Sequence, residues 1–170
     1  MKFMPRKINM TRILFSIYCL LLIWLILFKL SFSLEDIKML MGNRSVNFMP
    51  FHYDQFVSIH SREVLWNFIV FVPFGIYLKM LDVTNKKSIL CGLVISLIFE
   101  IIQFIFGMGA SDITDLLTNT LGTVVGVYFY VLLMKIFKNK LKVNKFFNGV
   151  AIIGIVCVLL LAALLFIANR

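Results

Sequence analysis

Long apolar runs alternate with short polar connections along the whole chain. Five of these runs approach the roughly 20 residues that a helix needs to cross a bilayer. They are 13–32, 64–81, 88–107, 116–137 and 150–168. Pro73 and Gly75 interrupt the second run, which predicts a kinked or tilted helix. The pattern therefore predicts an all-α fold, a polytopic membrane bundle of about five transmembrane helices, in one domain over residues 1–170.

The first run, 13–32, has a second interpretation as a signal peptide. Basic residues precede it, and Ser31-Phe32-Ser33 is a poor small-x-small cleavage site. Its apolar core is long for a leader, and Lys29 interrupts its end. We therefore expect a retained helix.

Composition supports the membrane class. Hydrophobic residues make up 61% of the chain and charged residues 15%, and the mean hydropathy is +0.98. A soluble domain this apolar would lack the polar surface to cover its core. The cysteines, Cys19, Cys91 and Cys157, lie within apolar runs and predict packing residues rather than disulfides. His52 and His60 have no metal-ligand spacing, so we predict no metal or cofactor.

Basic residues gather at the ends of the apolar runs, and the formal net charge is +9. This placement favours contact with membrane lipid headgroups over nucleic-acid binding. An inside N-terminus puts most of them in the cytoplasm: Lys2, Arg6, Lys7, Arg12, Lys79, Lys86, Lys87, Lys135, Lys138, Lys140, Lys142 and Lys145. Those left outside are Lys29, Lys38, Arg44, Arg62 and Arg170. The bias predicts an N-in, C-out multi-pass protein of the bacterial plasma membrane.

Carboxyl and amide side chains concentrate near the predicted outer ends of the second, third and fourth runs. The candidate binding residues are Asn67, Glu100, Gln103, Asp112, Asp115 and Asn119. Glu100 and Gln103 share a helical face, and Glu100 lies about 10 Å below the outer helix end. A carboxylate facing lipid there would cost several kcal/mol, so Glu100 should face the bundle interior and have a partner.

The fourth run carries a stripe of polar and small residues. Asp115, Asn119, Gly122 and Gly126 follow spacings of four, three and four. The two glycines let another helix approach closely. We expect the third and fourth runs to pack as an antiparallel hairpin whose polar residues meet near the outer surface, with Asn67 at their level. A bland interpretation stays open, in which the glycines serve packing and the amides join helices.

Local signals refine this picture. Ser111 or Asp112 would cap the fourth helix, and Asp115 suits the positive end of its dipole. Pro73 leaves a backbone carbonyl that a polar neighbour can satisfy. The connection 33–63 is predicted to be an extracellular loop, and its aromatic residues suggest an interfacial lid. These are Phe48, Phe51, Tyr53 and Phe56.

The ordered set of motifs resembles the VanZ-like family of small bacterial membrane proteins. The stretches are RSVNFMPF (Arg44–Phe51), NFIVFVPFG (Asn67–Gly75), and FEIIQ (Phe99–Gln103) followed by DITDLLTNTLGTVVG (Asp112–Gly126). The resemblance spans roughly Arg44 to Lys138 and implies an envelope protein. The family takes its name from resistance to teicoplanin-type glycopeptides.

One position departs from the family pattern. Members commonly have an Arg in the turn before the acidic motif, where this chain has Gly109. An Arg there would pair with Glu100 or an acid of the turn. Its absence leaves Arg44 or Arg62 as substitutes, or leaves the site without such a partner.

Four functions stay open at this point. We favour a non-enzymatic envelope factor that binds a lipid-linked wall component or a lipoglycopeptide. An enzyme using Glu100 as general acid or base lacks any accompanying Ser/His/Asp or His-Glu-x-x-His pattern. A small proton-coupled transporter would have few helices unless it formed a homodimer, and its predicted inner half lacks the polar residues of a complete path. A structural or immunity protein would bind another membrane protein through the glycine stripe.

Overall fold

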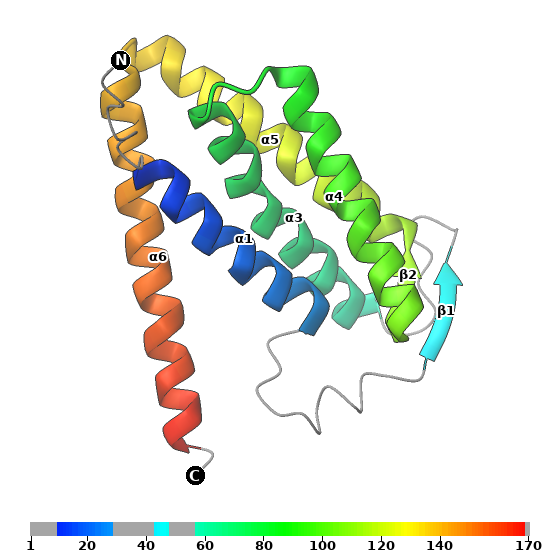
Figure 1. Cartoon of the computed structure of the whole chain (residues 1–170). Helices are drawn as coiled ribbons and strands as arrows, with labels where there is room; N and C mark the ends of the chain where they lie inside the picture. Colours follow the sequence, from blue (N-terminus) through cyan, green and yellow to red (C-terminus); the bar gives the residue numbers. More distant parts are fainter. Residues whose placement is uncertain (1–9, 29–42, 48–56, 169–170) are drawn as a thin grey trace, which may run out of the picture.

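Five helices and one pair of short strands make up the structure, a computed structural model that describes residues 10–28, 43–47 and 57–168 (Figure 1). The helices are α1 (Met10–Phe28), α3 (Val57–Met80), α4 (Asn85–Phe106), α5 (Ile113–Phe137) and α6 (Lys140–Ala168). The strands are β1 (Asn43–Asn47) and β2 (Met108–Asp112), and they pair in parallel. The predicted helical bundle is confirmed, with this small strand pair as an addition.

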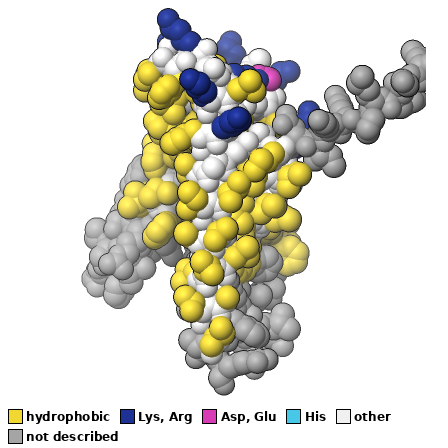
Figure 2. Space-filling model, turned by 90° about the vertical axis from the view of Figure 1, so that its left-hand side faces the viewer, with side chains coloured by type: hydrophobic (Ala, Val, Ile, Leu, Met, Phe, Trp, Pro, Cys, Tyr) yellow, Lys and Arg dark blue, Asp and Glu magenta, His cyan; other side chains and the backbone are white. Residues whose placement is uncertain are grey.

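Four of the described helices are long and apolar enough to cross a membrane, namely α1, α4, α5 and α6. The apolar part of α3, Val64–Met80, is shorter. Many large hydrophobic side chains are exposed along the described helices. On the face drawn in Figure 2 they spread over the body of the molecule, while Lys and Arg side chains gather towards one end. An apolar outer surface of this kind is what a lipid environment requires. The N-in, C-out orientation stays a prediction.

All five helices begin before their apolar runs, and α3 and α6 do so by the most. Helix α3 starts at Val57, inside the expected loop 33–63, and β1 also falls within that segment. Helix α6 starts at Lys140 rather than at position 150. An apolar run marks only what can lie in hydrocarbon, whereas a helix continues through lysines whose charged ends reach water. The aromatic residues proposed as a lid, and His52, lie outside the described residues.

The centre of the bundle is the contact between α3 and α5. A Cβ added at Gly122 or Gly126 would lie within 3.0 Å of a carbonyl oxygen of α3, that of Phe68 or Val72 respectively. On the other side, a Cβ at Gly75 would lie within 3.0 Å of the α5 backbone. From Gly122 to Gly126 the contacting residue on α3 also moves four residues forward, from Phe68 to Val72. The helices α3 and α5 therefore run parallel. The glycine stripe thus serves the α3–α5 contact, not the α4–α5 hairpin.

Helix α4 runs antiparallel to α5 and packs against its other side, where Gly92 meets the Thr123 side chain. Helix α1 crosses the bundle on the far side of α3 (Figure 1). One apolar cluster joins α1, α3 and α4 through Leu22, Ile26, Leu27, Phe71, Phe74, Leu78 and Phe99. A second joins α1, α3, α5 and α6 through Leu14, Ile76, Tyr77, Met80, Tyr130 and Val143.

The helix around Pro73 has a polar neighbour, as expected, but at a different carbonyl. A residue with an N–H at position 73 would have bonded the carbonyl of Ile69. The Tyr18 hydroxyl of α1 instead donates to the carbonyl oxygen of Val70, one residue further on. This bond ties α1 to the middle of α3.

Candidate binding site at the acidic end of the bundle

The described charges separate to the two ends of the bundle. One end, which we call the basic end, is formed by the start of α1, the end of α3, the start of α4, the end of α5 and the start of α6. The charged residues of these segments and of the turns that join them are Arg12, Lys79, Lys86, Lys87, Lys135, Lys138, Lys140, Lys142 and Lys145, with Asp82 as the acid among them. At the other, the acidic end, α4 finishes, α5 begins and the strands pair. Glu100, Asp112 and Asp115 lie there. This separation follows the pattern of charges along the sequence.

Glu100 is buried at the acidic end and is bonded to the segment that follows its own helix. Its side chain is 6% exposed. Its Oε2 accepts a hydrogen bond from Ser111 Oγ at 3.0 Å and one from the backbone N–H of Asp112 at 2.9 Å. The reversal that brings β2 back over α4 occurs at Gly107, whose φ of 65° is left-handed and suits glycine. Glu100 therefore has the interior partners that its burial demanded.

Asp112 connects three elements. Its Oδ1 accepts the N–H of Thr114 at 2.8 Å and so caps α5, which decides between the two candidate caps. Its Oδ2 accepts a hydrogen bond from Asn47 Nδ2 of β1 at 3.2 Å. No helical or strand periodicity in the sequence pointed to Asn47 as a site residue, because its contact with Asp112 depends on the pairing of β1 with β2.

Asn119 is buried one level deeper, between α4 and α5. It is 1% exposed, and its Nδ2 donates to Ser96 Oγ at 2.9 Å. Its Oδ1 has no hydrogen-bond partner in the described part of the chain. Ser96 was missed by the sequence analysis, although it lies four residues before Glu100 on the same helical face. Polar contacts therefore do connect α4 and α5, as the predicted hairpin requires.

Of the remaining candidates, Gln103 and Asn67 lie apart from this group, whereas Asp115 lies close enough to Glu100 for the two carboxyl groups to interact electrostatically. The Gln103 side chain donates to the carbonyl oxygen of Ile26 on α1 at 3.2 Å, away from β2. Asp115 occupies the first turn of α5, and its carbonyl accepts the Thr118 hydroxyl at 3.3 Å. Asn67 is half-buried and adjoins Phe68 at the level of Gly122, so it lies deeper than Asp115. No hydrogen bond among the described residues joins Asn67 to the other candidates.

The site is rich in hydrogen-bond acceptors. Glu100 Oε1 and Asn119 Oδ1 accept no hydrogen bond within the described ranges. A ligand that offers hydroxyl, amide or ammonium donors would complement them. In those same ranges, no group of three His, Cys, Asp or Glu side chains could hold a metal ion.

We expect Asp112→Ala to destabilise the protein by about 1 kcal/mol, because α5 loses its cap. Asn47 also loses one acceptor, so β1 should loosen. Asp112→Asn keeps an oxygen for the Thr114 N–H and is the matched control. Unfolding of both variants in detergent measures the difference, and an equal loss in the two would contradict the capping role.

The segments described above also match a known protein family. Residues 15–138 match the family model described as VanZ/LLP1. The chain belongs to the VanZ/LLP1 family. It is 37% identical over 154 residues to Protein VanZ of Enterococcus faecium, which covers 89% of this chain and 90% of that protein. No solved structure matches the chain significantly.

The VanZ/LLP1 match is wider than the motifs alone suggested. It begins within α1 and extends to the end of α5, so it includes every residue of the acidic-end site described above. Together with the apolar helices, it makes this chain a VanZ-like membrane protein. Helix α6 lies beyond the matched range.

The strand register bears on the missing Arg of the family pattern. Arg44 of β1 pairs with Gly109 of β2. Of the two candidate substitutes, Arg44 is therefore the register neighbour of the position in question. Arg62 belongs to the first part of α3.

Proposed function

We propose that this VanZ-like protein is a non-enzymatic factor of the bacterial plasma membrane that protects against teicoplanin-type glycopeptides. It would do so by binding a lipid-linked wall component, or the lipoglycopeptide itself, at the outer leaflet. The observation that carries this proposal is the buried Glu100 carboxylate, bonded to β2 at the acidic end. Positive-inside topology would turn that end outward.

The chemistry of the site suits such ligands. Wall precursors and glycopeptides present sugar hydroxyls and peptide amides, which are donors for the unused oxygens of Glu100 and Asn119. An acyl anchor on the ligand would lie along the apolar surface of the helices, as lipid does. Binding through several such contacts needs no reacting nucleophile.

The middle of the bundle argues for binding rather than transport. Between the two ends, the space among α1, α3 and α4 is filled by Phe71, Phe74, Phe99 and their aliphatic neighbours. A proton or solute path would need polar groups through this region. Buried polar side chains do follow the contact between α4 and α5, namely Ser88, Ser96, Asn119 and Thr123. The donors of Ser88, Asn119 and Thr123 are already used in hydrogen bonds to Ser96 or to backbone carbonyl oxygens.

The test is the teicoplanin inhibitory concentration in a sensitive Gram-positive host. Cells would carry empty vector, wild type, Glu100→Gln or Gly154→Ala, with membrane expression matched by blot. Gly154 is a suitable control because a Cβ added there meets nothing within 4 Å. We expect several-fold protection from wild type and Gly154→Ala, and its loss in Glu100→Gln.

Two results would count against the proposal in different ways. If wild type gives no protection at matched expression, the resistance function is wrong for this protein. If Glu100→Gln protects as well as wild type, the resistance function stands but the acidic-end site does not carry it.

A further inference from the structure

A pocket of about 440 Å³ lies at the basic end, far from the acidic-end site. The turn between α3 and α4, the last turns of α5 and the start of α6 surround it. Three lysines line it, Lys79, Lys135 and Lys140, together with the apolar side chains of Val83, Val131 and Met134. The size is in the range of small-ligand sites, about 300–1,000 Å³.

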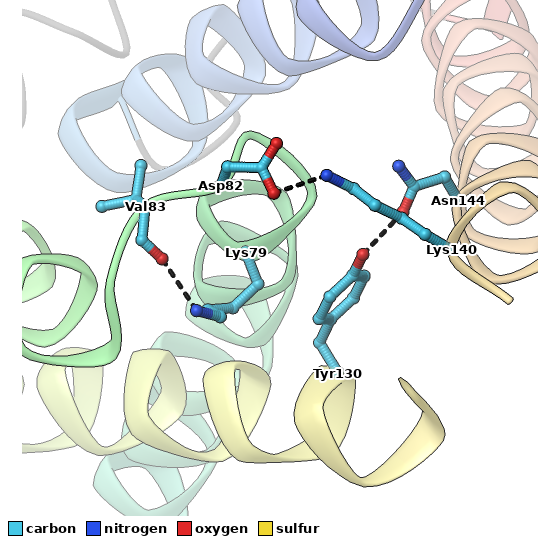
Figure 3. A network of polar contacts seen from close by, with 6 residues as sticks. All are labelled: Lys79, Asp82, Val83, Tyr130, Lys140 and Asn144. Atoms are coloured by element: carbon cyan, nitrogen blue, oxygen red, sulfur yellow. Dashed lines mark hydrogen bonds and ion pairs between the residues drawn. The ribbon is translucent and has the colours of Figure 1, made fainter. Parts of the chain in front are cut away.

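Hydrogen bonds fix the walls of this pocket (Figure 3). Lys79 Nζ donates to the carbonyl oxygen of Val83 at 2.8 Å, and Lys140 forms an ion pair with Asp82 at the rim. The Tyr130 hydroxyl donates to Asn144 Oδ1 at 2.8 Å and joins α5 to α6. Hydrogen bonds therefore hold Lys79 and Lys140 in place, while Lys135 lines the same pocket from α5.

The pocket keeps a surplus of positive charge and of donors. Three ammonium groups face one carboxylate, that of Asp82, whose side chain is 77% exposed. An ammonium has three N–H donors, and Lys79 and Lys140 each use one in the contacts above. Lys135 makes no hydrogen bond or ion pair within the described residues. An anion entering the pocket could displace Asp82 from Lys140, because that carboxylate is already open to water.

The position of the pocket selects among anions. It adjoins the end of the membrane-spanning window of α5, Ile113–Phe137. Next to it, α5 presents exposed apolar side chains, including Leu132, Ile136 and Phe137. A ligand with a phosphate and acyl chains would place its charge among the lysines and its chains on this surface. Basic pockets between helices at a membrane surface bind lipid headgroups in this way.

We propose that this pocket binds the phosphate headgroup of an anionic phospholipid, with Lys79, Lys135 and Lys140 as its cationic contacts. The site is separate from the acidic-end site and does not rest on the function proposed for it. The same phosphate chemistry occurs in soluble phosphate esters, so the experiment must separate the two sources.

The experiment measures the thermal unfolding of the full-length protein in neutral detergent. Added probes are phosphatidylglycerol, phosphatidylcholine, or glycerol phosphate. The triple variant Lys79→Gln, Lys135→Gln, Lys140→Gln removes the pocket cations. The matched control is Lys86→Gln, Lys87→Gln, Lys142→Gln, which removes the same charge at the same end from exposed residues that do not line the pocket.

We expect phosphatidylglycerol, but not phosphatidylcholine, to raise the unfolding temperature of wild type and of the control triple. The pocket triple should lose most of that shift. The single variant Lys135→Gln should weaken the apparent affinity about fivefold, since one lysine near a lipid surface contributes about 1 kcal/mol. Because Lys135 makes no hydrogen bond or ion pair among the described residues, this variant should fold and keeps the test valid if the triple does not.

Three results would overturn the proposal. Equal losses in the two triple variants would mean diffuse attraction to the basic end rather than a site. An equal shift with glycerol phosphate would assign the pocket to soluble phosphate esters instead of lipid. An unchanged phosphatidylglycerol affinity in Lys135→Gln would remove that lysine from the site.

Discussion

Replacing Gly126 by alanine should disrupt the bundle, at a cost of about 3 kcal/mol or more. The added Cβ would lie within 3.0 Å of the Val72 carbonyl oxygen and carbon, which are backbone atoms of α3. A flexible side chain could move aside, but the backbone of a helix moves only if α3 separates from α5. Since the close approach of the two helices runs from Phe68 to Ile76 of α3, one methyl group there should weaken the contact over several turns.

Unfolding in detergent measures this effect, together with the amount of folded protein recovered. Gly154→Ala is the matched control, because it adds the same methyl to a membrane helix where nothing lies within 4 Å. Its stability should stay near wild type. Equal unfolding midpoints for Gly126→Ala and Gly154→Ala would mean that α3 and α5 do not approach as closely as the structure has them.

The second large effect is expected for Glu100→Leu, which removes the acceptor that holds β2 on α4. The Ser111 hydroxyl and the Asp112 N–H would lose their partner. A buried donor left without one costs about 1–3 kcal/mol. Insertion of α4 should become easier, because a carboxyl in the membrane is itself costly. We therefore expect Glu100→Leu to reduce the local order around β2 and the protection against teicoplanin. The amount of protein in the membrane should stay unchanged.

Amide hydrogen exchange over Met108–Thr114 measures that local order. A loss of about 1.4 kcal/mol corresponds to tenfold faster exchange, and we expect at least this in Glu100→Leu. Glu100→Gln keeps a carbonyl oxygen for the Asp112 N–H and should exchange much closer to wild type. If both variants exchange like wild type, the Glu100 carboxylate does not hold β2.

The identity of the helices was predictable because apolar runs of membrane length are a strong signal. Their starts were not, since Val57 and Lys140 begin helices in polar surroundings. Asn139 caps the start of α6, because its Oδ1 accepts the N–H of Lys142 at 3.0 Å. Val143 in the first turn is also buried in the apolar cluster that includes Tyr130 of α5. Such a contact between separate elements has no periodic trace in the sequence.

The candidate site was predictable in part for the same reason. The cost of a carboxylate in hydrocarbon required a partner for Glu100, and the start of α5 required a cap from Ser111 or Asp112. The choice of Asp112 as the cap and of Ser111 as a partner of Glu100 depends on the chain reversal at Gly107 and on the pairing of β1 with β2. Asn47 and Ser96 entered the site only through those contacts.

The sequence by itself determined which segments are helical, that charge separates to two ends, and that Gly122 and Gly126 form a close helix contact. Each of these follows from local composition and spacing, which act within a few turns of one helix. Only the tertiary structure decided that α3 packs against those glycines and that three lysines line one pocket. It also decided that Asp112 caps α5 while the Ser111 hydroxyl donates to Glu100. These depend on contacts between residues far apart in the chain, because packing geometry, and not spacing, selects the partner.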